Sequence, residues 1–234
     1  MSIFRIHTAA VASLAVVFGG SALADDTVST TPPPDMSHPL LVPYMTLDIS
    51  GGWPYDVSTT GGFAADMGMQ LGGSIGLGMR MGPVLVEAQF EEHTFFLNNL
   101  NPVPPATLPA SDYEGDVDIY AMTGQIAVEF GETGFIRPYV GLAGGVASIS
   151  ADYYENLCTL CSPGVRFVSE SDYALVWSAT AGLTFNASGT AAYYIGYRHF
   201  GTANFDLSTT GGAAFTHKGL RSDSIELGIR VAFN

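Results

Sequence analysis

From residue 43 onward, the chain alternates apolar and polar side chains in segments of about ten residues. The last segment is the clearest, with Ile225, Leu227, Ile229, Val231 and Phe233 on one face and Ser224, Glu226, Gly228, Arg230 and Ala232 on the other. A period of two is the repeat of a β-strand. No 3.6-residue apolar stripe with capping signals accompanies it. The pattern therefore predicts an all-β fold.

Eight segments carry this alternation. They cover residues 44–53, 74–81, 84–91, 119–130, 136–146, 173–185, 191–200 and 224–233. Short connections at 82–83, 131–134 and 186–190 alternate with long ones at 55–72, 92–116, 147–172 and 201–220. Short turns at one rim and long loops at the other are typical of a transmembrane β-barrel. We therefore expect the apolar face to point toward lipid.

The polar face consists mainly of Gly, Ala, Ser and Thr, interrupted by single charged residues. These are Asp48, Arg80, Glu87, Glu129, Arg137, Arg198, Glu226 and Arg230. Small residues with balanced charges fit the narrow lumen of an eight-stranded barrel, where arginines can pair with carboxylates. The alternative is the solvated face of a soluble sheet, which would favour Lys and long polar side chains. Lys218, in a long connection, is the only lysine.

Aromatic residues near the segment ends are candidates for membrane-interface girdles. They are Tyr120, Phe130, Phe135, Trp177, Phe185, Tyr193 and Phe233.

The first 24 residues have the features of a cleaved secretory signal peptide. Arg5 supplies a positive charge, an apolar stretch covers 9–18, and Ala22-Leu23-Ala24 gives the small-x-small cleavage pattern. Residues 25–42 contain Pro32-Pro33-Pro34 and are predicted to be an extended linker. Residues 43–234 then form the predicted barrel. The formal net charge of −14 excludes nucleic acid as a partner, because neutralising phosphates requires a basic surface.

Three stretches resemble the small outer-membrane β-barrel family: RPYVGLAGG at 137–145, GYRHF at 196–200 and IELGIRVAF at 225–233. That family includes porin-like surface antigens of Gram-negative bacteria and the transmembrane domain of outer-membrane protein A. The resemblance implies an all-β, eight-stranded antiparallel transmembrane β-barrel with short periplasmic turns and long extracellular loops, in the cell outer membrane. It also implies lipopolysaccharide and the barrel-assembly machinery as partners, with Phe233 as the aromatic assembly signal. Family members usually end on the aromatic residue, whereas Asn234 follows here.

No catalytic residue, metal ligand set or cofactor is predicted. His199 invites comparison with lipid A deacylases, but those barrels carry a serine shortly after the histidine, and here Gly201, Thr202 and Ala203 follow. A histidine with no nucleophile has nothing to activate. Cys158 and Cys161 lack a second pair of zinc ligands and are predicted to form a disulfide after export.

The long connections are acidic. Their carboxylates are Glu91, Glu92, the acids of 112–118, Asp152, Glu155, Glu170 and Asp172. The simplest interpretation is a solvated surface, with divalent-cation bridging to lipopolysaccharide as the alternative. This surface is also the candidate binding site for an extracellular ligand.

The sequence predicts a structural or surface-interaction role in the envelope, with a lumen plugged by Arg/Glu pairs. One alternative is a narrow ion-conducting channel. Gly51-Gly52-Trp53 also matches the GxW of lipocalins, so a soluble lipocalin-like carrier is a third hypothesis.

Overall fold

The computed structural model describes residues 41–60, 63–102, 112–131, 134–156, 165–186 and 190–233. The predicted signal peptide, most of the predicted linker, and Cys158 and Cys161 lie outside these ranges. No helix within them is long and apolar enough to cross a bilayer.

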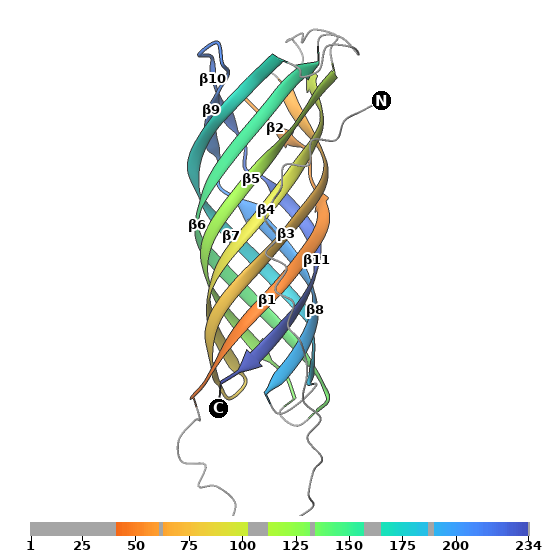
Figure 1. The fold of residues 1–234 in the computed structure, drawn as a ribbon, viewed down its shortest axis with the longest axis vertical. Helices are drawn as coiled ribbons and strands as arrows, with labels where there is room; N and C mark the ends of the chain where they lie inside the picture. The colour runs from red at the N-terminus through yellow and green to blue at the C-terminus, as the bar shows by residue number, and fades with distance from the viewer. Residues whose placement is uncertain are drawn as a thin grey trace, which may run out of the picture. The chain divides into compact units, whose positions relative to one another are not determined.

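Eight antiparallel strands close into a ring in the order β1-β3-β4-β5-β6-β7-β8-β11 and back to β1. The ring strands are β1 (Leu41–Pro54), β3 (Phe63–Met81), β4 (Val84–Pro102), β5 (Asp112–Glu129), β6 (Ile136–Asn156), β7 (Val165–Asn186), β8 (Ala191–Thr202) and β11 (Arg221–Ala232). Short strands β2 (Val57–Ser58), β9 (Phe205–Ser208) and β10 (Ala214–His217) lie at the other end from the chain's C-terminus (Figure 1). Each predicted segment falls within, or within one residue of, one ring strand, so the eight-stranded antiparallel barrel is confirmed.

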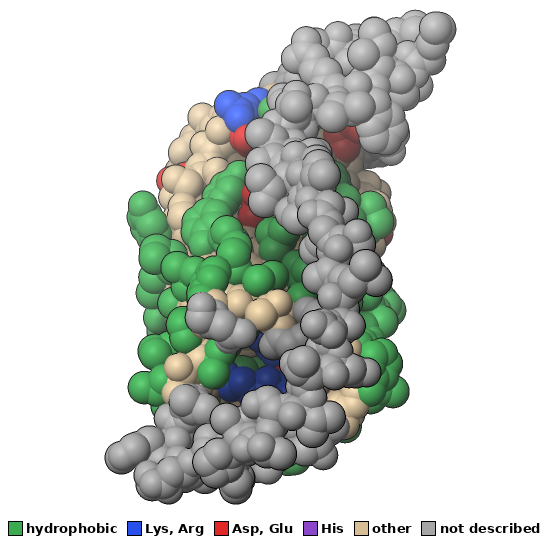
Figure 2. Space-filling model, turned by 60° about the horizontal axis from the view of Figure 1, so that its bottom comes forward, with side chains coloured by type: hydrophobic (Ala, Val, Ile, Leu, Met, Phe, Trp, Pro, Cys, Tyr) green, Lys and Arg blue, Asp and Glu red, His purple; other side chains and the backbone are tan. Residues whose placement is uncertain are grey.

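The apolar stripe of the lower part of the barrel points outward. Leu77, Met122, Leu142 and Leu175 are each between 66% and 69% exposed. Figure 2 shows hydrophobic side chains on the barrel wall and basic side chains at the end turned toward the viewer. In water this band would be strongly unfavourable, whereas in lipid it is the surface that a barrel needs.

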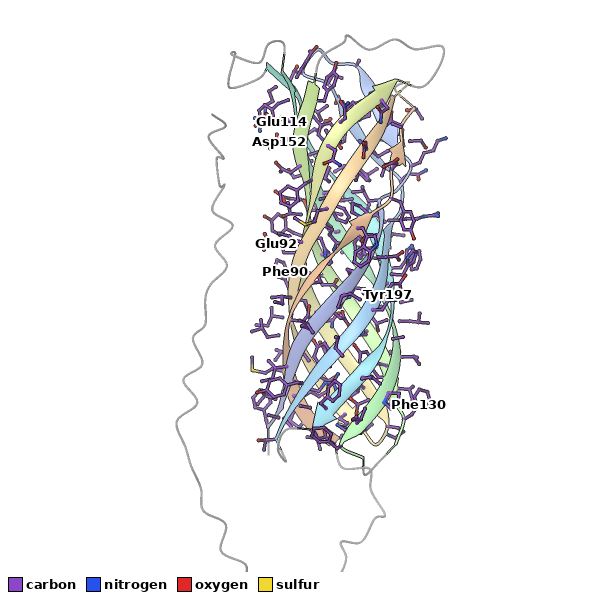
Figure 3. The ribbon with its side chains drawn as sticks, turned by 90° about the vertical axis from the view of Figure 1, so that its right-hand side faces the viewer. Phe90, Glu92, Glu114, Phe130, Asp152 and Tyr197 are labelled. Carbon is purple, nitrogen blue, oxygen red and sulfur yellow. The ribbon has the colours of Figure 1, made fainter. Side chains whose placement is uncertain are left out.

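Aromatic side chains bound the apolar band at two heights. Phe130 lies near one end of the barrel, and Phe90 and Tyr197 lie near its middle (Figure 3). Beyond the middle position the outer wall becomes polar, with Glu92, Asp152 and Glu114 toward the far end. We call the wall between these aromatic levels the membrane band, and the part beyond Phe90 and Tyr197 the upper barrel.

The strands run well past the predicted segment ends. β4, β5, β6 and β7 continue into regions expected to be long loops, and they remain paired with their neighbours. On β5 and β6 the inward and outward parity does not change, but the polarity of the two faces does. On β5, Tyr120, Met122 and Ile126 are exposed in the membrane band, whereas the next inward residues, Ile119 and Val117, are fully buried. The upper barrel is therefore apolar inside and polar outside.

A contiguous apolar core fills the upper barrel. Its members come from nearly every strand that reaches this level: Val57, Phe63, Ala65, Met67, Phe95, Leu97, Leu100, Tyr113, Val117, Ile119, Ala121, Ala147, Ile149, Ala151, Tyr153, Val168, Ala174, Val176, Phe200, Phe205, Leu207, Phe215 and Leu220. The upper barrel therefore has the apolar interior and polar exterior of a water-soluble protein, whereas the membrane band below it has an apolar exterior suited to lipid.

Three neighbouring strands are interrupted where the two parts meet. The breaks fall at 55–56 between β1 and β2, at 203–204 between β8 and β9, and at 218–220 between β10 and β11. Gly219 has a φ of 72° at the last break, which a side chain would strain. Above the breaks, the β9–β10 hairpin continues the wall. It bridges to β7 through Val168 and Thr209, and to the end of β2 through Thr59 and His217.

Candidate functional site: the barrel lumen

The lower lumen contains an ionic layer centred on Glu129. This carboxylate lies 2.6 Å from Arg80, 2.6 Å from Arg230 and 3.4 Å from Arg137. Thr184 also donates a hydrogen bond to it, at 2.9 Å. Glu129 is only 3% exposed. Three guanidinium groups around one buried carboxylate leave this layer with an excess of positive charge.

A second ionic layer lies further up and is centred on Arg198. Its guanidinium binds Glu226 at 2.8 Å and Glu91 at 2.6 Å. Tyr139 donates a hydrogen bond to Glu226 at 2.9 Å, and Thr123 donates one to Glu91 at 2.5 Å. All three charged groups are at most 3% exposed. One buried arginine shared by two buried carboxylates gives this layer an excess of negative charge.

Asp48 and Glu87 make no salt bridge with an arginine in the part of the chain that the structure describes. Asp48 accepts hydrogen bonds from Ser74 at 2.5 Å and from Tyr194 at 3.0 Å. Glu87 accepts one from Gln89 at 2.8 Å and one from Thr46. Hydroxyl and amide donors therefore solvate these two carboxylates in place of opposite charges.

A cavity of about 20 Å³ separates the two ionic layers, and residues of both line it. That is enough room for about one water molecule. The Tyr44 hydroxyl and the Nε of Arg230 are buried polar atoms without a hydrogen-bond partner in the described structure, and both residues belong to the cavity wall. The space between the two layers thus has room for an isolated water molecule.

Glycines let bulky side chains cross the lumen. A Cβ on Gly228 would lie 2.2 Å from the Tyr194 ring, and one on Gly78 would lie 2.4 Å from the Tyr44 ring. Arg230 lies over both rings, at 5.1 Å from Tyr44 and 5.6 Å from Tyr194. The glycines on the polar face therefore create the space that these two tyrosines fill.

The structure places all eight predicted lumen charges on the inner face. Six are buried: Asp48, Glu87, Glu129, Arg137, Arg198 and Glu226. The side chains of Arg80 and Arg230 are 25% and 11% exposed. The structure brings Glu129 together with three of the arginines and Arg198 together with Glu226, while Asp48 and Glu87 bind neutral groups instead.

The assignment of Glu91 to an acidic loop surface was wrong. Glu91 is 1% exposed, lies within β4 and binds Arg198. It has the same parity as Glu87 and Gln89 and is the last residue of the predicted segment 84–91, so the alternation itself already places it on the polar face. His93, two residues further along β4, lies 3.1 Å from Glu91 and 2.8 Å from Gln70, and it was not among the predicted lumen residues.

The remaining candidate residues lie outside the lumen. Phe233 is 48% exposed on the outer surface, and its backbone N–H donates to the Pro43 carbonyl at 2.8 Å, next to the start of β1. His199 lies on the outer wall with its ring 5.3 Å from that of Trp177. The described residues contain no cluster of His, Cys, Asp and Glu suited to a metal ion.

Comparison with known proteins gives matches at the level of structure only. No protein-family description and no curated protein sequence matches the chain. Neisserial surface protein A is similar with a TM-score of 0.51 and 16% identity, over 82% of this chain and 97% of that one. The outer membrane protein OprG from Pseudomonas aeruginosa is similar with a TM-score of 0.54 and 14% identity, over 84% and 98%.

These two likenesses and the lipid-facing band lead to the same conclusion. The ring of eight strands closes without a free edge, so backbone groups pair between neighbouring strands as a membrane-spanning sheet requires. The exposed apolar band supplies the surface that contacts lipid. The chain therefore has the fold of the small eight-stranded β-barrels of the Gram-negative outer membrane.

Proposed function

We propose that this protein is a non-conducting barrel with a structural or surface-interaction role in the outer membrane. The observation that carries the proposal is the filling of the lumen: one ionic layer within the membrane band, a second at its upper edge, and an apolar core above them. The layers are cross-linked between strands far apart in the ring, because Arg198 on β8 binds both β11 and β4. An ion passing through would have to break buried, charge-assisted hydrogen bonds and then cross the apolar core.

The outer face of the upper barrel supports the surface-interaction part of this role. Carboxylates project from adjacent strands there, and Asp116 on β5 lies directly opposite Asp152 on β6 in the register. Glu92, Glu114 and Asp152 mark this acidic wall (Figure 3). A rigid acidic surface favours cationic partners and repels anionic ones. Lipopolysaccharide around the barrel, and the barrel-assembly machinery during insertion, remain the other proposed partners.

Planar-bilayer recording tests the closed lumen. The purified barrel, shown to be folded by heat-modifiable migration on a denaturing gel, is added to a bilayer in concentrated KCl. We expect no discrete conductance steps, while a known porin added to the same bilayer produces them. Reproducible steps whose size changes in an Arg198→Gln variant would overturn the proposal and establish the narrow-channel alternative, in which the polar cavity between the layers is part of the path.

A further inference from the structure

The ionic layer around Glu129 lies at the ends of the strands, beside the short turns of the barrel. Arg80 is the last residue but one of β3, and Arg137 is the second residue of β6. Glu129, which both arginines contact, is the last residue of β5. Phe130 follows it and lies near the lower end of the barrel (Figure 3). Figure 2 turns this end toward the viewer and shows basic side chains there. The layer is therefore at the lower mouth of the lumen.

The guanidinium groups of this layer have more hydrogen-bond donors than the described residues offer acceptors. Each guanidinium carries five N–H donors. Among the described residues, Arg230 donates to Glu129 at 2.6 Å, and its Nε is buried without a partner. Arg137 donates to Asn186 at 2.6 Å, its side chain is only 8% exposed, and its Nε also lacks a partner there. Buried donors without an acceptor are costly, and a bound ion or water is a common reason for them.

The charges of the layer do not balance. Three arginines surround one carboxylate, which leaves an excess of two positive charges among the described residues of the layer. Glu87 lines the cavity above together with Arg230, but it accepts hydrogen bonds from Gln89 and Thr46 and offsets only part of this excess. The chain as a whole has 22 acidic and 8 basic residues, so the lower mouth differs in sign from most of the molecule.

Arg80 makes the layer accessible from the mouth. Its side chain is 25% exposed, the largest value among the three arginines. Its Nε donates to the Gly82 carbonyl at 3.0 Å, in the turn between β3 and β4, and its second contact is with Glu129. These two contacts use a minority of its five N–H donors. The structure thus holds a guanidinium at the rim with donors left for a ligand.

We infer that the lower mouth binds a doubly charged oxyanion, either free phosphate or the phosphate group of a monoester. A phosphate group carries about −1.5 to −2 charges at neutral pH, so its charge opposes the excess of the layer. Guanidinium groups bind phosphate through pairs of parallel hydrogen bonds, which favours phosphate over a spherical ion such as chloride. The inference concerns the mouth alone and does not depend on whether the lumen conducts.

Isothermal titration calorimetry tests the site. The folded protein in non-ionic detergent, at neutral pH and constant ionic strength, is titrated with inorganic phosphate, with glycerol 3-phosphate and with sodium chloride. We expect saturable binding of one phosphate per barrel and no saturable heat with chloride. Binding of both phosphates supports a mouth that also accepts a phosphate group on a larger molecule, and binding of the free ion alone supports a site for that ion. Equal saturable heat with chloride, or no saturable binding of either phosphate, overturns the inference.

Matched variants locate the binding. Arg80→Gln removes the exposed guanidinium while Arg137 and Arg230 still contact Glu129, so the barrel should fold. Its affinity for phosphate should fall at least about tenfold, the usual effect of losing a hydrogen bond to a charged group. Arg166→Gln changes an exposed arginine near the other end of β7 and should leave the affinity unchanged. Heat-modifiable migration checks that each variant is folded. Unchanged affinity in Arg80→Gln, or an equal loss in Arg166→Gln, contradicts the inference.

A third variant concerns Glu132, which follows β5 and lies outside the described residues. The wild-type protein should already bind phosphate, and Glu132→Gln should bind it no less tightly. Phosphate binding that appears only in Glu132→Gln overturns the inference, because a carboxylate of the chain itself would then occupy the site.

Discussion

At the scale of single residues, the lumen arginines differ in how many carboxylates depend on them, and this difference decides which arginine contributes most to the free energy of unfolding. Arg198 alone serves both Glu91 and Glu226, whereas Arg137 is one of three arginines around Glu129 and the most distant of them. Removing Arg198 leaves Glu226 without an ionic partner among the described residues and Glu91 with only the His93 ring, whereas removing Arg137 leaves Glu129 with two arginines.

Arg198→Met should therefore lower the free energy of unfolding by about 3–5 kcal/mol, the usual cost of breaking a buried pair. Arg137→Met should cost less than about 2 kcal/mol, because Arg80 and Arg230 still contact Glu129. Urea unfolding of the barrel in lipid vesicles, followed by gel migration, measures both. Equal destabilisation by the two changes would show that the pairs do not act as the distances indicate.

His217 gives the upper barrel a dependence on pH. Its ring stacks on Phe205 at 4.9 Å, and Nε2 lies 3.4 Å from the Tyr153 hydroxyl. Burial lowers the pKa of His217 from 6.5 to about 4. Between these values the unfolded segment binds a proton that the folded segment excludes, so stability falls as pH drops below about 6.5.

The expected loss reaches about 3 kcal/mol near pH 4 and is confined to the upper barrel. Amide hydrogen exchange of β9 and β10, compared between pH 7.5 and 4.5 after correction for intrinsic rates, measures it. A His217→Gln variant should lose most of this pH dependence. The prediction fails if wild type and variant respond equally to acid.

At the scale of strands, the alternation in the sequence predicts the lipid-facing segments but not the strand ends. The predicted segments end at residues 91, 119 and 173, where the outer wall changes from apolar to polar. The change falls between Phe90 and Glu92 on β4 and between Tyr120 and Asp118 on β5. Beyond this level the apolar residues face the barrel interior instead of the outside. A pattern of apolar residues followed along the outer face therefore ends there, although the strand continues. Reading both parities would have extended β5 and β6; the pairing of β9 and β10 with distant segments depends on tertiary contacts.

The sequence predicted which charges line the lumen more readily than how they pair. Parity alone assigns Glu129 and Arg230 to the inner face. Pairing depends on strand tilt and register, which bring together residues such as Arg198 and Glu91 that are 107 positions apart. No local pattern contains that information.

Strand glycines supply a prediction at this scale. Gly228→Ala places a methyl group 2.2 Å from the Tyr194 ring, which is held by its bond to Asp48 and by Arg230 above it. We expect a loss of about 1–3 kcal/mol from overpacking. Gly124→Ala is the matched control, since its added Cβ meets nothing within 4 Å. Equal stability of the two variants, measured by urea unfolding, would mean that Tyr194 moves aside freely.

At the scale of the whole molecule, the proposed closed lumen has three barriers in series. The layer around Glu129 lies below the layer around Arg198, and the apolar core fills the barrel above both. Replacing Arg80, Arg137, Arg230 and Glu129 together by serine should therefore leave the barrel non-conducting, because the two upper barriers remain. Single-channel recording checks this outcome. Discrete steps in that variant alone would show that the Glu129 layer is the only effective barrier.

The packed interior of the upper barrel determines what kind of surface a binding partner contacts there. β6 extends ten residues past Val146, which at about 3.4 Å per residue and a tilt of roughly 40° corresponds to about 25 Å along the barrel axis. Along that height, an antibody or phage contacts side chains displayed by neighbouring strands instead of a continuous peptide. Epitopes there are therefore conformational, and boiling should abolish their recognition.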